Sequence, residues 1–215
     1  ANVVAKNDTV EAGAGVRFKR VTSAAQTAGI PGFEWMEGIP GNVGGGIRMN
    51  AGAMGTETFD QVVSVTYINQ EGQVRTKTKD EIVHHYRNVP EFTENYVVSV
   101  VFRGLGDDVD GIADRIAKSK RKRKDSQPIA ASAGCIFKNP SLCGAGQLVD
   151  ELGLKDTTVG KARVSEVHGN FIVNEGKATA KEVLELIAQI QAKAKEVRDV
   201  ELETEVQILG QDERY

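Results

Sequence analysis

The segment from Gly38 to Gly55 carries the residues most able to do chemistry, because its glycines leave the backbone bare. It reads Gly-Ile-Pro-Gly-Asn-Val-Gly-Gly-Gly-Ile-Arg-Met-Asn-Ala-Gly-Ala-Met-Gly. Glycine has no Cβ and tolerates positive φ, so several N–H groups can converge on one phosphate or carbonyl oxygen. The glycines able to form such a nest are Gly41, Gly44, Gly45, Gly46 and Gly52. A tight structural loop that needs glycine only to turn is the alternative. Neither a Walker loop nor a strand-to-helix dinucleotide turn matches this spacing.

The cysteines and adjacent histidines point to little chemistry by themselves. Cys135 and Cys143 are too few for a disulfide framework, and cysteines of this kind usually pack as small apolar side chains. His84 and His85 are neighbours without a third ligand, so we expect no metal site.

The composition is that of an ordinary soluble globular protein. The chain has 215 residues, of which 40% are hydrophobic and 27% charged, with a net charge of −3. The basic run from Lys118 to Lys124 reads as a solvated helix end, although it could attract phosphate. With no charged leader and no apolar run of spanning length, we expect a cytoplasmic protein with no membrane partner. The mildly acidic net charge predicts no nucleic-acid partner. We also expect a monomer.

The elements that must position these residues indicate an α+β fold. The first part combines strands with a helix at Phe18–Ala28 that Gly29 closes, whereas the helical period dominates from Asp110. Thr179 and Glu182 form a capping box ahead of a further helix. The expected strands are Thr9–Ala12, a hairpin of Val62–Asn69 with Gln73–Thr78, Tyr96–Phe102, Cys135–Lys138, Asn170–Val173 and Glu201–Leu209. A domain boundary is expected near Gly104–Asp110.

The order of the motifs resembles the UDP-N-acetylenolpyruvoylglucosamine reductases over nearly the whole chain. The resemblance begins with Gly-Ile-Pro-Gly, Gly-Gly and Met-Asn-Ala-Gly in the glycine segment. It continues through Tyr86-Arg87, Ser132–Pro140, Gly146–Lys155, Val164–Asn174 and Leu202–Val206. One such motif would be weak evidence, but six in the same order make chance an improbable explanation.

The resemblance implies a flavoenzyme of peptidoglycan synthesis. Its members use FAD and NADPH to reduce UDP-N-acetylglucosamine enolpyruvate to UDP-N-acetylmuramate. The implied domains are an FAD-binding domain at 1–106 and an α+β substrate-binding domain at 107–215, whose final strand returns toward the flavin. The Gly-Ser-Asn-Leu-type turn of the family's first FAD subdomain has no counterpart here. We therefore expect a remnant of a two-part FAD domain, with weak or absent flavin binding.

Three residues match the family's catalytic positions. Cys135 falls where members usually have a serine that protonates the enol carbon, and a thiol with a reference pKa of about 8.5 can replace it. Arg87 would hold the enolpyruvyl carboxylate, since a guanidinium forms a planar fork onto carboxylate oxygens. Glu205 would support the intermediate or relay a proton. Spacing alone favours the other explanation, that Glu205 belongs to a solvated acidic strand edge with Glu201 and Glu203.

The other site residues follow from the same match. The expected FAD contacts are Gly38, Ile39, Pro40, Gly41, Gly44, Gly45, Asn50, Ala51 and Gly52. The expected substrate contacts are Tyr86, Arg123, Lys138, Asn139 and His168.

Two other functions fit the same residues. The chain could be a non-catalytic module that binds UDP-sugars through its second domain, or another flavin oxidoreductase of the same fold. Flavin reduction by NADPH would separate the reductase from both.

Overall fold

A computed structural model describes residues 2–210 and divides the chain into two compact units. Unit 1 comprises Ala1–Arg123 and unit 2 comprises Lys124–Tyr215, so the division falls inside helix α4 (Ile112–Ser126). Each unit has its own hydrophobic core. The expected boundary at 106 and 107 stays a prediction, because compactness does not say which unit binds which ligand.

Unit 1 is built on an antiparallel sheet of five strands in the order β1-β2-β7-β5-β6. The strands are β1 (Val3–Lys6), β2 (Thr9–Gly13), β5 (Val62–Ile68), β6 (Val74–Thr78) and β7 (Tyr96–Arg103). A separate small hairpin is formed by β3 (Gly52–Ala53) and β4 (Thr56–Glu57). The helices are α1 (Phe18–Thr27), α2 (Val43–Arg48) and α3 (Thr58–Gln61), with 3-10 turns η1 (Glu34–Met36), η2 (Lys79–Glu81) and η3 (Pro90–Phe92).

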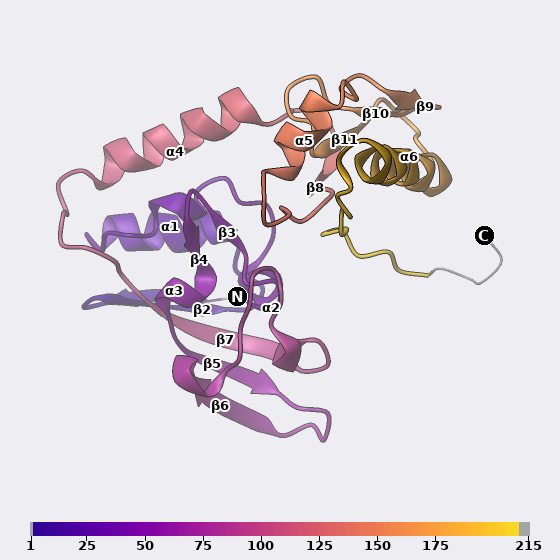
Figure 1. The fold of residues 1–215 in the computed structure, drawn as a ribbon. Coiled ribbons are helices and arrows are strands. Elements are labelled where there is room, and N and C mark those ends of the chain that lie inside the picture. The colour runs from indigo at the N-terminus through magenta and orange to yellow at the C-terminus, as the bar shows by residue number, and fades with distance from the viewer. Residues whose placement is uncertain (1, 211–215) are drawn as a thin grey trace. The chain divides into compact units, whose positions relative to one another are not determined.

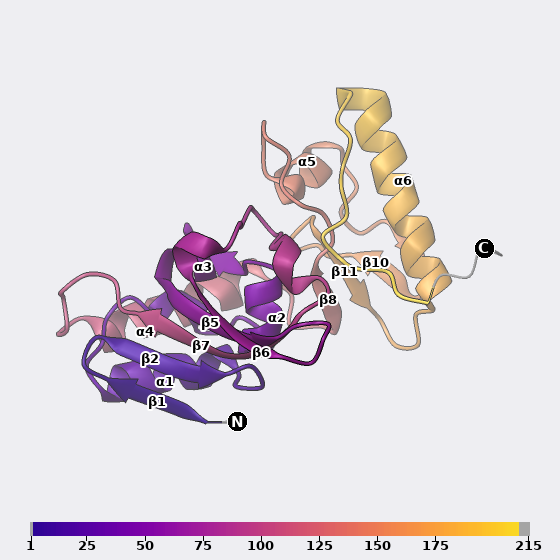
Figure 2. The ribbon, with the colours of Figure 1, turned by 90° about the horizontal axis from the view of Figure 1, so that it is seen from below.

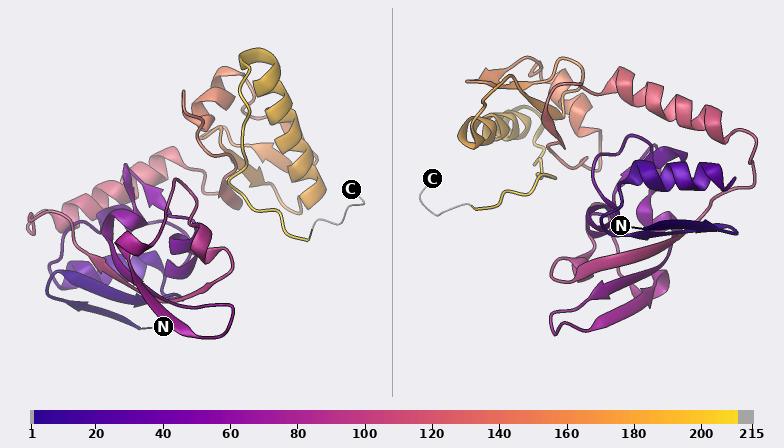
Figure 3. Two further views of the ribbon diagram at one scale, coloured as in Figure 1. Left: turned by 60° about the horizontal axis from the view of Figure 1, so that its bottom comes forward. Right: turned by 180° about the vertical axis from the view of Figure 1, so that it is seen from behind.

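One face of this sheet is buried because apolar residues alternate along its central strands. Val10 pairs with Phe102 and Ala12 with Val100, and all four are almost fully buried. Helix α1 covers β1 and β2, and α2 covers β2 and β7. Figure 1 and the right panel of Figure 3 show α1 lying along the sheet.

Unit 2 is built on an antiparallel sheet of four strands in the order β8-β11-β10-β9. The strands are β8 (Ser132–Cys135), β9 (Thr158–Val159), β10 (Ala162–Val164) and β11 (Phe171–Asn174), and the helices are α5 (Ala145–Glu151) and α6 (Ala180–Arg198). Helix α6 packs against β9 and β10. The segment that follows α6 runs back beside it, as Figure 2 and the left panel of Figure 3 show.

Several predicted elements are confirmed where a local signal defines them. Helix α1 ends at Thr27, just before Gly29, and β5 and β6 form the expected hairpin with Gly72 at φ +75°. The capping box of α6 is present: Thr179 Oγ1 accepts from the Glu182 N–H at 3.2 Å, and Glu182 Oε2 accepts from the Thr179 N–H at 2.7 Å.

Two strand predictions in unit 2 are wrong. The strand expected at 135–138 lies earlier, at Ser132–Cys135, and residues 201–209 form no regular strand. Residues 201–209 make a single isolated bridge, between Thr204 and Phe137. The alternation of residues 201–209 is real, but β8 already ends at Cys135, so the chain beyond it offers this segment one bridge and no regular ladder.

The glycine segment is more regular than expected. Residues 43–48 form helix α2 although three consecutive residues of it, Gly44, Gly45 and Gly46, are glycines. Glycine is a poor helix former, so tertiary packing must stabilise this short helix. Among residues 2–210, no helix combines the length and the apolar character needed to cross a membrane.

Candidate active site

The glycines of α2 and its flanks have two separate tasks. A Cβ at Gly46 would lie 2.1 Å from Cζ of Phe18, and one at Gly52 would lie 2.7 Å from the Thr56 carbonyl oxygen. These glycines permit close packing. By contrast, a Cβ at Gly41 or Gly45 would meet nothing within 4 Å. The backbone is therefore open to a ligand at Gly41 and Gly45.

Part of the expected N–H nest is already used inside unit 1. The Val43 N–H donates to the Val16 carbonyl at 2.8 Å, and the Gly44 N–H donates to the Ala14 carbonyl at 2.9 Å. The Gly46 N–H donates within the helix to Asn42. Gly44 and Gly46 are thus explained by the internal structure of unit 1. At Gly41 and Gly45 the backbone is still open for a ligand, as the nest hypothesis requires.

Asn50 joins the end of α2 to two other segments, residues 57–59 and the loop at His85. It is 1% exposed and adopts a positive φ of 43°. Its Oδ1 accepts from the Phe59 N–H and the Thr58 hydroxyl, both at 3.2 Å. Its Nδ2 donates to Glu57 Oε2 at 2.7 Å and to the His85 carbonyl at 3.1 Å. Asn50 therefore ties the glycine segment to the loop that carries Tyr86 and Arg87.

Arg87 donates to the backbone of the same segment. Its Nη1 donates to the Asn50 carbonyl at 3.2 Å and its Nη2 to the Gly52 carbonyl at 3.1 Å. Glu57 Oε1 lies 3.5 Å from Nη1, and the Arg87 guanidinium stands 4.7 Å from the centroid of the Tyr86 ring. The structure thus brings together the predicted residues Asn50, Gly52, Tyr86 and Arg87.

The face of α4 within unit 1 packs beside the start of the glycine segment. A Cβ at Gly38 would lie 2.9 Å from Cδ of Arg123, so the Arg123 side chain covers Gly38. Lys120 Nζ lies 3.6 Å from Glu37 Oε1, and Arg115 pairs with the buried Glu34. The basic run Lys118–Lys124 is therefore not only a solvated helix end, because its Lys120 is paired with Glu37 of unit 1.

In unit 2 the segments of Cys135 and Glu205 are adjacent. The Glu205 N–H donates to the Ile136 carbonyl at 2.7 Å, and the Lys138 N–H donates to the Glu203 carbonyl at 2.9 Å. Lys138 also forms an ion pair with Glu203. Cys135 and Cys143 are both half-buried.

Asn139 and His168 both lie beside the first turn of α5. Asn139 Oδ1 accepts from the Ala145 N–H at 2.9 Å, so this side chain organises the loop before α5. A Cβ at Gly146 would lie 2.5 Å from Cε1 of His168. The Asn170 N–H donates to His168 Nδ1 at 3.1 Å, which leaves the proton of the neutral ring on Nε2. Burial, assisted by the charge of Lys155, lowers the pKa of His168 below its ordinary value of 6.5.

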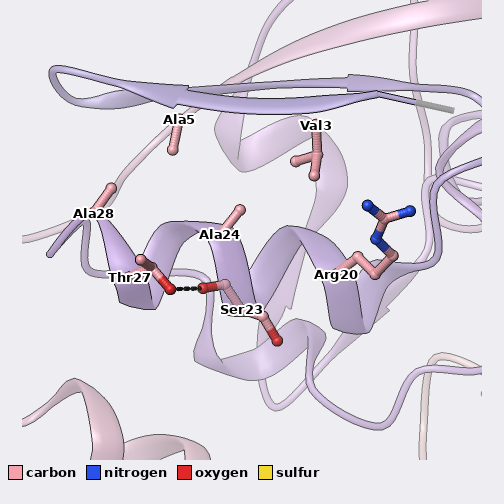
Figure 4. A pocket seen from close by; sticks show the side chains of 7 residues that line it. All are labelled: Val3, Ala5, Arg20, Ser23, Ala24, Thr27 and Ala28. Atoms are coloured by element: carbon pink, nitrogen blue, oxygen red, sulfur yellow. Dashed lines mark hydrogen bonds between the residues drawn. The ribbon is translucent and has the colours of Figure 1, made fainter.

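Two hollows in unit 1 are lined by none of the site residues predicted from the sequence. One of about 420 Å³ lies between β1 and α1, where Val3 and Ala5 face Ala24 (Figure 4). Another of about 410 Å³ includes Trp35 and Arg115. Among residues 2–210, no group of three or more His, Cys, Asp or Glu side chains is arranged to hold a metal ion.

Comparison with known proteins decides the family. A model of an FAD binding domain matches residues 1–77, and one described as UDP-N-acetylenolpyruvoylglucosamine reductase, C-terminal domain, matches residues 126–209. The reductase of Syntrophomonas wolfei is 40% identical over 98% of this chain and 71% of its own length. This chain belongs to the UDP-N-acetylenolpyruvoylglucosamine reductase family.

Other reductases agree with this assignment. The reductase of Syntrophus aciditrophicus is 39% identical over 94% of this chain and 65% of its own length. The crystal structure of the reductase from Thermus caldophilus is 38% identical, with a TM-score of 0.82 over 92% of this chain and 71% of that one. The chain therefore spans roughly two thirds to seven tenths of the length of these relatives. The family, the α+β fold, the oxidoreductase class and the FAD cofactor predicted from the sequence are confirmed.

The assigned roles of the site residues stay predictions, and two further residues were missed. Glu57 accepts from Asn50, pairs with Arg87 and caps α3, and Asn170 pairs with Phe137. An acidic residue after Gly55 and an asparagine before a strand are both common, so neither gave a signal before their partners were known.

Proposed function

We propose that this reductase-family chain takes part in the NADPH-driven, FAD-dependent reduction of UDP-N-acetylglucosamine enolpyruvate to UDP-N-acetylmuramate. The observation that carries the proposal is a two-way network: Arg87 donates to the backbone of the Met-Asn-Ala-Gly segment, and Asn50 of that segment donates to the His85 carbonyl. It connects the segment proposed for the cofactor with the Tyr-Arg pair proposed for the substrate.

The reaction adds two hydrogens across the vinyl group of the substrate. A hydride enters at the terminal CH2 carbon, which leaves negative charge at the carbon beside the carboxylate, and a proton then neutralises that carbon. FAD, reduced by NADPH, supplies the hydride when it is bound. The protein must supply a cation for the developing charge and an acid for the proton.

Open backbone at Gly41 and Gly45 fits a planar cofactor, because a Cβ there would occupy space that no other atom fills. The remaining proposed FAD contacts are Gly38, Ile39, Pro40, Gly44, Asn50, Ala51 and Gly52. Of these, Asn50 is buried and acts by fixing the segment.

Arg87 is the proposed cation for the enolate, and its bonds to Asn50 and Gly52 hold it in place beforehand. Cys135 is the proposed acid, with its thiol proton delivered to the carbon beside the carboxylate. Glu205 is proposed to support the proton transfer, since its backbone is bonded to Ile136, the residue after Cys135. Arg87 belongs to unit 1 and the other two to unit 2, so their meeting at one substrate is part of the proposal.

The proposed substrate contacts extend over both units. His168 can donate from Nε2 to an oxygen of the nucleotide, and its lowered pKa keeps the ring neutral at physiological pH. Asn139 Nδ2 has no partner among residues 2–210 and can donate to a sugar or phosphate oxygen. Tyr86, Lys138 and Arg123 complete the set. The cytoplasmic location and the monomeric state expected from the sequence stay predictions.

The test is the visible spectrum of the purified chain with added FAD, followed by NADPH and then the enolpyruvyl substrate. Bleaching of the flavin by NADPH and its reoxidation by the substrate would support the reductase. A flavin that is reduced by alcohols or sugars but not by NADPH would indicate a different flavin oxidoreductase.

A UDP-sugar-binding module is the second candidate, because unit 2 has a core of its own. Calorimetry with UDP-N-acetylglucosamine distinguishes the two. Binding by a protein that takes up no flavin would favour the module over the reductase.

A further inference from the structure

Asn170 occupies the point where regular pairing between β8 and β11 stops. Phe171 still pairs with Cys135, but the register is irregular between Phe171 and Val173. Beyond Cys135 the chain continues through Ile136 and Phe137, both 1% exposed. Their backbone groups need partners, because an unpaired buried amide or carbonyl costs about 1–3 kcal/mol.

Asn170 provides these partners with its backbone and its side chain. Its carbonyl accepts from the Ile136 N–H at 2.9 Å. Its Oδ1 accepts from the Phe137 N–H at 2.8 Å, and its Nδ2 donates to the Phe137 carbonyl at 2.8 Å. The side-chain amide thus replaces one residue of a neighbouring strand, and Asn170 is only 2% exposed.

The same short stretch of backbone is held from its other side by the segment of Glu205. The Glu205 N–H donates to the Ile136 carbonyl at 2.7 Å, and Thr204 forms a bridge with Phe137. Residues 136 and 137 therefore lie between Asn170 on one side and Thr204 and Glu205 on the other. A shift of Phe137 would move Cys135 and the Glu205 segment relative to each other.

We propose that Asn170 is a positioning residue of the reductase, whose side-chain amide fixes Cys135 and the Glu205 segment in register for proton transfer. The role in proton transfer depends on the proposed function, whereas the register itself can be measured without substrate or cofactor. Proton delivery needs the donor to be held within about 0.5 Å of its productive position. Only an amide of this length offers one acceptor and one donor to the two Phe137 groups, because aspartate lacks the donor and serine is too short.

Amide hydrogen exchange of the full chain tests the register. In Asn170→Asp the carboxylate faces the Phe137 carbonyl without a donor. We expect the protection of the Ile136, Phe137 and Glu205 amides to fall about tenfold or more at neutral pH. Acidification should restore it, because a protonated aspartate carries an O–H donor. Unchanged protection at these amides, or no recovery on acidification, would overturn the proposal.

Asn174→Asp is the matched control, because Asn174 lies at the other end of β11 from Asn170. Asn174 Oδ1 only accepts from the Gly176 and Ala178 N–H groups, which aspartate can also do. Its protection pattern should match that of the unaltered chain. An equal loss of protection at the Ile136, Phe137 and Glu205 amides in Asn174→Asp would show that any added negative charge near β11 has this effect, and would overturn the proposal.

The reactivity of Cys135 tests the positioning role. In a Cys143→Ser background Cys135 is the only thiol, and the pH dependence of its alkylation by a small maleimide can be followed. Asn170→Asp should shift the pH midpoint of Cys135 alkylation or change the alkylation rate about tenfold. Asn174→Asp should change neither quantity. An unaltered profile would leave Asn170 with a purely structural role and overturn the proposal.

The unaltered chain decides the matter if Asn170→Asp does not fold. In that chain the amides of Phe137 and Glu205 should exchange through one opening, with equal protection. Protection that differs by more than about tenfold would show that the two sides move independently, against the proposal. None of these measurements involves flavin or nucleotide, so their failure and that of the reductase proposal remain distinguishable.

Discussion

Arg87 and Asn50 show how much of the candidate site depends on backbone recognition by side chains. Arg87 adopts φ +55° and Asn50 adopts φ +43°, both in the left-handed region of the backbone that residues other than glycine rarely adopt. Each directs its polar atoms at the backbone of the other's segment. Such backbone conformations persist where surrounding contacts hold them, which is common at functional sites.

The sequence located these residues but not their contacts. Cys135, Arg87 and Glu205 were found by motif order, which needs no three-dimensional information. The partners of Asn50 and Asn170 lie up to 35 residues away in the chain. No local pattern specifies such pairs, so Glu57 and Asn170 could not be recognised in advance.

Replacement of Cys135 tests the proposed acid at the scale of one residue. In flavin-loaded protein, Cys135→Ala should lower product formation by about 10²- to 10⁴-fold, the usual contribution of a general acid. NADPH should still bleach the flavin, because that step does not need the thiol. Cys135→Ser should keep much of the activity, since a hydroxyl can also donate. Normal turnover by the alanine variant in a product assay would remove Cys135 from the mechanism.

At the scale of elements, local signals were sufficient only where the element is defined locally. The capping box of α6, the turn at Gly72 and the glycine after α1 each lie within a few residues of the element they end or begin. Helix α2 was missed because its sequence disfavours a helix and packing against β2 and β7 stabilises it. The strand at 201–209 was wrongly predicted because alternation does not show whether a partner strand exists.

Helix α2 offers a matched pair of substitutions. Gly46→Ala should destabilise the protein by about 1–3 kcal/mol, since its Cβ would overlap the Phe18 ring. Gly45→Ala should be neutral or stabilising by about 0.5–1 kcal/mol, because its Cβ is unhindered and alanine favours helix. Urea unfolding measures both free energies.

The same pair separates packing from ligand binding. If FAD approaches the bare backbone of α2, Gly45→Ala should weaken FAD binding in a titration although it leaves the fold intact. FAD affinity equal to that of the unaltered chain would show that the cofactor does not contact Gly45.

At the scale of the whole molecule, the two separate cores mean that the units can respond separately to solution conditions. His168 belongs to unit 2 and has a pKa lowered mainly by burial. Below pH 6.5 the unfolded state then binds a proton that the folded state excludes. The free energy of unfolding of unit 2 should therefore fall as the pH decreases from 6.5, and be regained as it rises.

Urea unfolding over a series of pH values checks this prediction, with amide exchange in α6 as the measure of unfolding of unit 2. His168→Gln is the control, because it removes the titrating group while keeping a polar side chain. A pH dependence between 6.5 and 5 that is equal in both proteins would assign the effect to other groups.

Ligands should also act on the units separately. FAD is proposed to bind the glycine segment of unit 1, and a ligand that binds only the folded state stabilises it by about 2.7 kcal/mol at a hundredfold excess over its Kd. We therefore expect FAD to raise protection from amide exchange throughout the sheet of β1, β2, β7, β5 and β6, whereas UDP-N-acetylglucosamine should protect β8, β11 and α5. The protein without ligand is the reference, and adenosine monophosphate at equal concentration is the control for nonspecific nucleotide binding. Protection by FAD confined to unit 2 would contradict the assignment of the flavin to Gly38–Gly52, even if the chain proved to be an active reductase.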